Sequence, residues 1–289
     1  ESGELDEADL DRAVTRNVAL SLLGGDIHAN PVEADQISHH TLAQRAATES
    51  AVLLKNDDDT LPLANDQHIA VIGAFAKRPR YQGTGSSQVN PTQLDNTWDA
   101  LVGLLGEEQL SYAAGYDPKQ SDLDDSLIDI AVKAATTATT AVVFAGLPSI
   151  YESEGFDRSH MQLPDQHNRL IEAVCAANPN TVVVLLNGAP VAMPWIDQPK
   201  AILEGYLMGQ AGGAGIAALL CGLANPSGKL AETFQVAQGD ALSDANFPGT
   251  GRQVLYREGL YVGYRFFDSA NVDVLFPFGH GLSYTTFAY

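Results

Sequence analysis

The sequence has 289 residues, of which 16 are basic and 36 acidic, so its formal net charge is −20. A chain of this length that is 45% hydrophobic is typical of a globular protein with a sizeable core, not of a disordered one. The charge argues against a nucleic-acid partner and against docking on an anionic membrane, because both need clustered Lys and Arg.

A helix is predicted over residues 4–23, because apolar side chains recur every four positions. These side chains are Leu10, Val14, Val18 and Leu22. Asp6 is suited to cap the start of this helix, and Gly24-Gly25 is expected to end it. The stretch 28–35 has no periodicity and contains a proline, so it is predicted to be a linker.

From residue 36 onward the pattern indicates an α/β protein. The predicted helices cover residues 36–55, 123–137, 164–178 and 210–223. The predicted strands cover residues 68–73, 109–112, 141–146, 181–188 and 201–206. Strands that alternate with helices of 10–15 residues favour βαβ units and a mostly parallel sheet. We therefore expect a three-layer α/β/α sandwich with helices on both faces of the sheet, and few helix signals in the last fifty residues.

Two polar loops follow predicted strands, and ligands of open α/β sheets bind at the carboxyl ends of strands. The loop at 80–91 is rich in Gly and Ser, which suits either a surface turn or the lining of a site. It lacks the Lys of a phosphate-binding loop and does not begin a helix, which excludes nucleotide-binding motifs. The loop at 147–158 carries Glu152, Glu154 and Asp157, which suits either a solvated acidic loop or a glycosidase carboxyl pair.

The second loop, Glu152-Ser153-Glu154-Gly155-Phe156-Asp157-Arg158, resembles the acid/base loop of glycoside hydrolase family 3. Other blocks resemble the same family, in the family's order. They lie at residues 47–56, 61–63, 83–91, 188–195, 209–213, 225–230, 256–265 and 276–284.

The resemblance implies that residues 36–289 form the second domain, the C-terminal α/β sandwich, of a retaining β-glycosidase, most often a β-glucosidase. Residues 1–35 resemble the last helix of a preceding (β/α)8 barrel and its linker. In the family the nucleophilic Asp lies in that barrel, so this chain alone is expected to be inactive. The expected partners are a carbohydrate substrate and the barrel of the same protein. The sequence does not decide whether the protein forms a homo-oligomer.

By the resemblance, Glu154 is the general acid/base, with Glu152 as the alternative. Like-charged Glu152 and Asp157 would raise the pKa of Glu154, whereas Arg158 would oppose this. Asp157 and Arg158 are expected to support the loop as an ion pair.

In the first loop, substrate is expected to contact Tyr81, Gly85, Ser86 and Ser87. His280, Trp98 and Trp195 are expected to be structural, and the block 257–263 is expected to return to the sheet. The alternative function is a non-catalytic module that binds carbohydrate or docks a partner.

The sequence does not suggest a cofactor or a metal. Cys175 and Cys221 are too few for a disulfide framework, and with seven scattered histidines they show no zinc-ligand spacing. Both cysteines are expected to pack as small hydrophobic side chains, and two unpaired cysteines favour the cytoplasm. Residues 1–11 are acidic and lack the apolar core of a signal peptide, so none is expected there.

Overall fold

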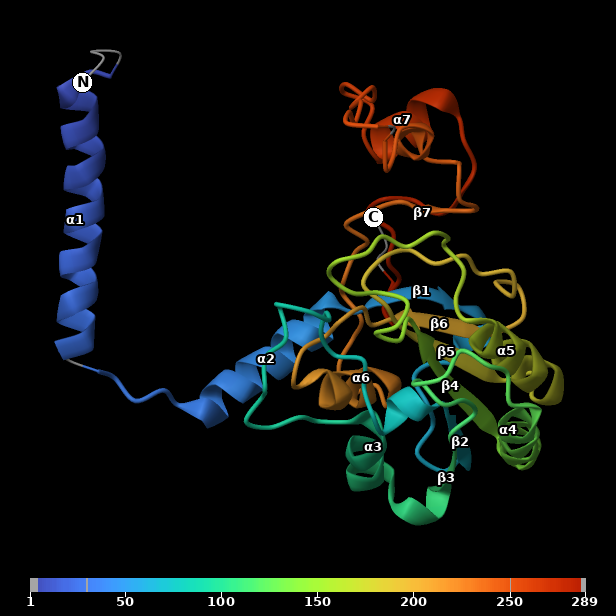
Figure 1. Ribbon diagram of the computed structural model, residues 1–289. Coiled ribbons are helices and arrows are strands. Elements are labelled where there is room, and N and C mark those ends of the chain that lie inside the picture. The colour runs from blue at the N-terminus through green and yellow to red at the C-terminus, as the bar shows by residue number, and fades with distance from the viewer. Residues whose placement is uncertain (1–4, 30, 250, 287–289) are drawn as a thin grey trace. The chain divides into compact units, whose positions relative to one another are not determined.

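The computed structural model of the protein describes residues 5–29, 31–249 and 251–286. The chain divides into two units, Glu1–His39 and His40–Tyr289. The first contains helix α1 (Glu7–Ala29), and helix α2 (Gln36–Ser50) begins in the first unit and ends in the second (Figure 1). Within the described ranges, no helix has the length and apolarity needed to cross a membrane.

A six-stranded sheet forms the centre of the second unit, with the strand order β1-β6-β5-β4-β2-β3. The strands are β1 (Val52–Asn56), β2 (Ile69–Ile72), β3 (Leu110–Ala113), β4 (Thr140–Gly146), β5 (Thr181–Leu186) and β6 (Ala201–Glu204). The edge strand β1 runs antiparallel to β6, and the other neighbours are parallel. The predicted, mostly parallel sheet is therefore confirmed.

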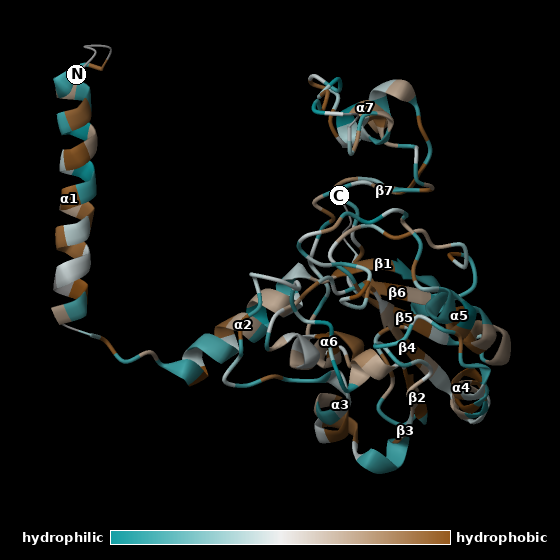
Figure 2. Ribbon diagram, viewed as in Figure 1, coloured by the Kyte–Doolittle hydropathy of each residue, from teal (hydrophilic) through white to brown (hydrophobic). Residues whose placement is uncertain are grey.

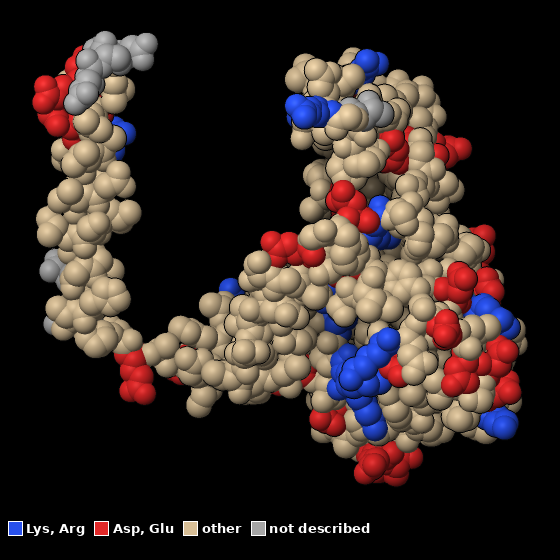
Figure 3. Space-filling view, in the orientation of Figure 1, with Lys and Arg blue, Asp and Glu red and all other residues tan. Residues whose placement is uncertain are grey.

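The inner strands are apolar because both faces of the sheet are covered. Every residue of β2, β4, β5 and β6 is buried, and Figure 2 shows the hydrophobic colour concentrated on these strands. Glu204, the last residue of β6, is a fully buried carboxyl in this apolar setting. Carboxylates are instead spread over the visible surface of the molecule, as Figure 3 shows and as the net charge requires.

Helices pack in pairs on the two faces of the sheet (Figure 1). One pair is α3 (Thr97–Leu105) with α6 (Gly212–Leu220), and the other is α4 (Asp125–Thr137) with α5 (Asp165–Ala177). The three-layer α/β/α sandwich is confirmed. Local sequence sets the start of α4, where the Asp124 carboxylate accepts the backbone N–H of Ser126 at 3.0 Å.

Two predicted boundaries near the N-terminus are wrong. Gly24-Gly25 does not end α1, which continues to Ala29, since a mid-helix glycine costs only about 1 kcal/mol relative to alanine. The second helix does not reach Lys55, because the chain leaves the helix at Ser50 and enters β1. Residues 52–54 are buried there, and Val52, Leu53, Lys55 and Asn56 pair with β6, so sheet pairing overrides the helical pattern. The cap predicted at Asp6 is confirmed by its bond from the Ala8 N–H, 3.0 Å long.

The last fifty residues contain a helix that the sequence did not predict, α7 (Tyr264–Ala270). The block 257–263 does not return to the sheet; it has no regular structure and leads into α7. A separate antiparallel pair is formed by β7 (Phe234–Gln235) and β8 (Val274–Phe276). Short 3-10 helices cover Asp57–Asp59 (η1), Ala74–Ala76 (η2), Glu107–Gln109 (η3) and Leu242–Ala245 (η4).

Several residues that we expected to be structural are buried or hydrogen-bonded within the fold. Trp195 is fully buried and its indole N–H donates to Asn168 Oδ1 at 2.9 Å. His280 Nε2 lies 2.8 Å from the carbonyl oxygen of Leu54. Cys175 and Cys221 are unpaired and partly buried against the core, and burial raises the pKa of each thiol to about 11.

Candidate active site

Two loops leave the same edge of the sheet. Strands β2 and β4 are parallel neighbours, with Ile72 beside Val143, so the segments that follow them emerge together. The first segment contains the glycine-serine loop, residues 83–87, and the second contains the acidic loop, residues 152–158. The structure therefore brings together the two loops that the sequence singled out.

The loops contact each other at Glu154. The Ser86 N–H donates to Glu154 Oε2 at 2.5 Å, and the Glu154 N–H donates to the Thr84 carbonyl at 3.1 Å. Gly85 allows this approach, because its φ is +102° and a Cβ there would lie 2.6 Å from both Cβ and Oε2 of Glu154. Gly85 and Ser86 thus lie against the predicted acid/base.

A hollow of about 560 Å³ lies between the loops. Its lining consists of Gly83, Thr84, Ser86, Ser87, Glu152, Ser153 and Glu154. Tyr81 is not part of this lining. Its hydroxyl accepts a bond from Gln82 Nε2 at 2.8 Å, and it lines a smaller recess beside Met208 and Gly209.

The pKa of Glu154 differs from our expectation. Hydrogen bonds from the backbone and the side chain of Ser86 lower the pKa of Glu154, because they stabilise the charged carboxylate. The repulsion expected from Glu152 and Asp157 does not decide the direction, because Glu154 is exposed and solvent screens it. At neutral pH Glu154 is therefore an anion in this chain, the form that a general base requires.

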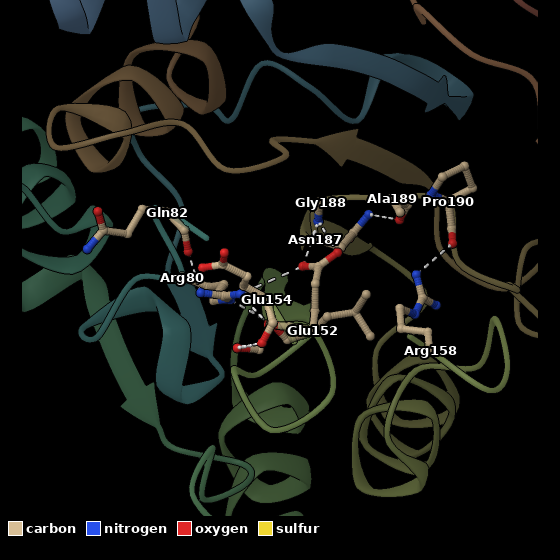
Figure 4. A network of polar contacts seen from close by, with 11 residues as sticks. Arg80, Gln82, Glu152, Glu154, Arg158, Asn187, Gly188, Ala189 and Pro190 are labelled. Atoms are coloured by element: carbon tan, nitrogen blue, oxygen red, sulfur yellow. Dashed lines mark hydrogen bonds and ion pairs between the residues drawn. The ribbon is translucent and has the colours of Figure 1, made fainter. Parts of the chain in front are cut away.

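Glu152 is held from two sides (Figure 4). Its carboxylate accepts the Gly188 N–H at 3.0 and 3.1 Å, and its carbonyl accepts Arg80 Nη2 at 3.0 Å. Arg80 Nη2 also lies 3.8 Å from Glu152 Oε2. A Cβ at Gly188 would lie 2.8 Å from Glu152 Oε1, so glycine permits the contact.

Arg80 connects the two loops and was not predicted as part of the site. Its side chain is 9% exposed, and it donates to the carbonyl oxygens of Leu147, Gln82 and Glu152. Burial lowers the pKa of Arg80, and the nearby Glu152 opposes this. The available signal was an arginine as the first residue of the predicted polar loop 80–91.

The ion pair expected between Asp157 and Arg158 is absent from the part of the chain that the structure describes. Asp157 is exposed, whereas Arg158 is partly buried and donates to the Pro190 carbonyl at 3.4 Å. Burial lowers the pKa of Arg158, and the charge of Glu152 opposes this. Arg158 thus faces inward, toward Glu152 and Pro190, because its long side chain reaches the turn after β5.

The described residues contain no group of three or more His, Cys, Asp and Glu side chains arranged to hold a metal ion. The polar groups on the hollow are carboxylates, hydroxyls and backbone amides. Such groups suit hydrogen bonding to a polar, uncharged ligand and proton transfer by a carboxyl group.

Comparison with known proteins identifies the family. Residues 51–284 match the glycosyl hydrolase family 3 C-terminal domain. Over its whole length the chain is 52% identical to the thermostable β-glucosidase B of Acetivibrio thermocellus, of which it covers 38%. It is 43% identical over 265 residues to an exo-α-(1->6)-L-arabinopyranosidase of Bifidobacterium longum, covering 88% of this chain and 34% of that protein.

Solved structures agree with this match. A family 3 β-glucosidase of Bifidobacterium adolescentis superposes with a TM-score of 0.93 and 41% identity, covering 99% of this chain and 42% of that one. DesR, a β-glucosidase of Streptomyces venezuelae solved in complex with D-glucose, gives a TM-score of 0.82 at 30% identity, covering 89% of this chain and 46% of that one. The chain spans less than half the length of these relatives. It belongs to glycoside hydrolase family 3 and contains the C-terminal α/β domain of that family.

Proposed function

We propose that this chain supplies the general acid/base of a retaining β-glycosidase of the β-glucosidase type, with Glu154 in that role. The nucleophilic Asp would lie in a (β/α)8 barrel of the same protein, next to residues 1–35. The family membership and the β-glucosidases among the relatives support this proposal.

The observation that favours Glu154 over Glu152 is the difference in their surroundings. Glu154 is exposed on the rim of the hollow, where a glycosidic oxygen can reach it. The Glu152 side chain is 18% exposed, and its carboxylate already accepts the Gly188 N–H and faces Arg80. Proton transfer by Glu152 would require breaking these contacts, so Glu152 is better suited to hold the loop.

In the proposed reaction Glu154 acts twice. It first donates a proton to the leaving glycosidic oxygen while the nucleophile forms a bond to the anomeric carbon. It then removes a proton from the water that breaks this bond. Ser86 stabilises the carboxylate needed for the second step. For the first step, sugar hydroxyls that bind the Ser86 N–H would remove this stabilisation and raise the pKa of Glu154, which favours the protonated form that donates.

The test uses the full-length enzyme and compares Glu154→Ala with the matched control Glu152→Ala. Loss of the acid should slow hydrolysis most for substrates with poor leaving groups, because an acidic phenol leaves without protonation. Loss of the base should make the glycosyl-enzyme accumulate, and azide should restore turnover by forming a β-glycosyl azide. Glu152→Ala should show no azide rescue.

Two results would contradict the proposal. Azide rescue of Glu152→Ala, with none for Glu154→Ala, would assign the acid/base to Glu152. A full-length protein that binds β-glucosides without hydrolysing them would favour the carbohydrate-binding module.

A further inference from the structure

Glu204 is a buried carboxyl group to which the proposed reaction gives no role. It ends β6 at the same edge of the sheet as the two loops, beside Leu185 of β5. Its side chain is fully buried, and an ionisable side chain is rarely placed in an apolar core without partners. Its hydrogen bonds therefore indicate what it does.

The carboxyl group connects the turns that follow β5 and β6. Oε1 accepts the N–H of Tyr206 at 2.8 Å, and Tyr206 has a φ of 53°, which a non-glycine residue seldom adopts. Oε2 accepts Asn187 Nδ2 at 3.2 Å. Glu204 thus stabilises its own turn and reaches across to the neighbouring one.

Asn187 continues the connection toward the acidic loop. It is fully buried directly after β5, and its Nδ2 also donates to the Ala189 carbonyl at 2.9 Å. These two bonds hold the turn 187–189 in one conformation. The N–H of Gly188, in the middle of that turn, then points at the Glu152 carboxylate.

The acidic loop is also held by the bonds of Glu154 to Thr84 and Ser86 and by the bond of Arg158 to Pro190, but it gains little from apolar packing. Glu154, Gly155, Phe156 and Asp157 are all exposed, so apolar packing does not hold them. The path Glu204–Asn187–Gly188–Glu152 ends two residues before Glu154, and Arg80 holds the same point from the other side. A shift of the turn after β5 would therefore move the loop that carries the proposed acid/base.

We infer that Glu204 is a positioning residue for the acid/base loop, acting through Asn187 and the Gly188 amide on Glu152. This inference rests on the proposed role of Glu154. Burial raises the pKa of Glu204 to about 8, and the hydrogen bonds from Tyr206 and Asn187 oppose this by stabilising the carboxylate.

The test measures kcat/KM in the full-length enzyme for β-glucosides with leaving groups of graded acidity. Glu204→Gln keeps the size of the side chain and an oxygen that accepts the Tyr206 N–H. Its amide N–H2 faces the N–H2 of Asn187, however, so the hydrogen bond from Asn187 is lost. We expect kcat/KM to fall about tenfold or more for alkyl β-glucosides, which is a part of the roughly 10²- to 10⁴-fold contribution of general-acid catalysis. For dinitrophenyl β-glucoside, which needs no proton, the fall should be small.

Gly188→Ala tests the same path from its exposed end, because the added Cβ would lie against Glu152. Gly188→Ala should also lower kcat/KM more for poor leaving groups than for good ones, so that the dependence on the leaving group steepens. If Glu204→Gln does not fold, Gly188→Ala is the variant that tests the path. The matched control is Glu232→Gln, which makes the same exchange at a half-buried acid that contacts the Tyr206 hydroxyl. It should leave the dependence unchanged.

Folded Glu204→Gln and Gly188→Ala enzymes whose activity falls equally for all leaving groups, or does not fall, would overturn the inference. Glu154→Ala serves as the reference. If that variant does not steepen the dependence, the proposed acid/base role itself is wrong. If it does while Glu204→Gln and Gly188→Ala do not, only the positioning role is wrong.

Discussion

The buried Glu204 should make the stability of the protein depend on pH. Its folded-state pKa is raised from 4.5 to about 8, chiefly by burial, with smaller contributions from Glu232 and Glu152. The Tyr206 N–H and Asn187 oppose the shift by stabilising the carboxylate. Above pH 4.5 the unfolded chain releases this proton whereas the folded chain retains it, so stability falls as pH rises.

The magnitude follows from the width of this window. Between about pH 4.5 and 8 the free energy of unfolding should fall by about 1.4 kcal/mol per pH unit, or roughly 5 kcal/mol in all. Above about pH 8 the folded chain also loses the proton, and the contribution of Glu204 stops changing. A loss of this size is a large part of the about 5–15 kcal/mol by which a typical domain is stable.

Glu204→Gln removes the titrating group and retains the shape of the neutral acid. Below about pH 4.5, where Glu204 is neutral in both the folded and the unfolded chain, the free energy of unfolding of the variant should be about 1 kcal/mol lower than that of the unsubstituted chain, for the lost Asn187 bond. It should lack the decline that the unsubstituted chain shows between about pH 4.5 and 8. Urea unfolding of both chains, followed by circular dichroism from pH 5 to 9, measures the difference.

The control for this measurement is Glu232→Gln, because the pKa of Glu232 is also raised by burial but its side chain is only partly buried. That variant should retain most of the decline with pH. Parallel pH profiles for Glu204→Gln and the unsubstituted chain would refute the reasoning, since they would show that Glu204 ionises alike in both states.

Two further predictions concern the candidate active site. The 289-residue chain alone should not release p-nitrophenol from aryl β-glycosides, because the proposed nucleophile lies outside it; release at an ordinary family rate would contradict this. Ser86→Ala should raise the pKa of Glu154, because it removes the side-chain hydrogen bond while the backbone N–H remains. Carbon-13 NMR titration of the glutamate carboxyl groups measures this pKa, with Ser87→Ala as the control, and an unchanged pKa in Ser86→Ala would refute the assignment.

The predictable parts of the fold were those set by local patterns. The apolar runs that became β4 and β5 can only be buried on both faces, so their place in a covered parallel sheet followed from composition. The polar loops after β2 and β4 were placed correctly because the carboxyl ends of parallel strands share one edge. The roles of their residues came from the family resemblance.

Other parts depended on partners distant in sequence. The sequence pattern of residues 52–54 suits a continuing helix. In the structure these residues lie in β1, because β6 is available as a pairing partner for that strand. The short helix α3 went unpredicted although Asn96 caps it, because its nine residues hold too few turns for a periodic signal.

The sequence by itself determined the layered α/β architecture, the two loops and the concentration of carboxylates in one of them. Only the tertiary structure decided what each charged group does. Arg80 and Glu204 lie about 70 and 50 residues from Glu152 and Glu154, and no local pattern joins them. Their function arises from burial, because a hydrogen bond or an unpaired charge changes the free energy of the protein far more in the interior than in water.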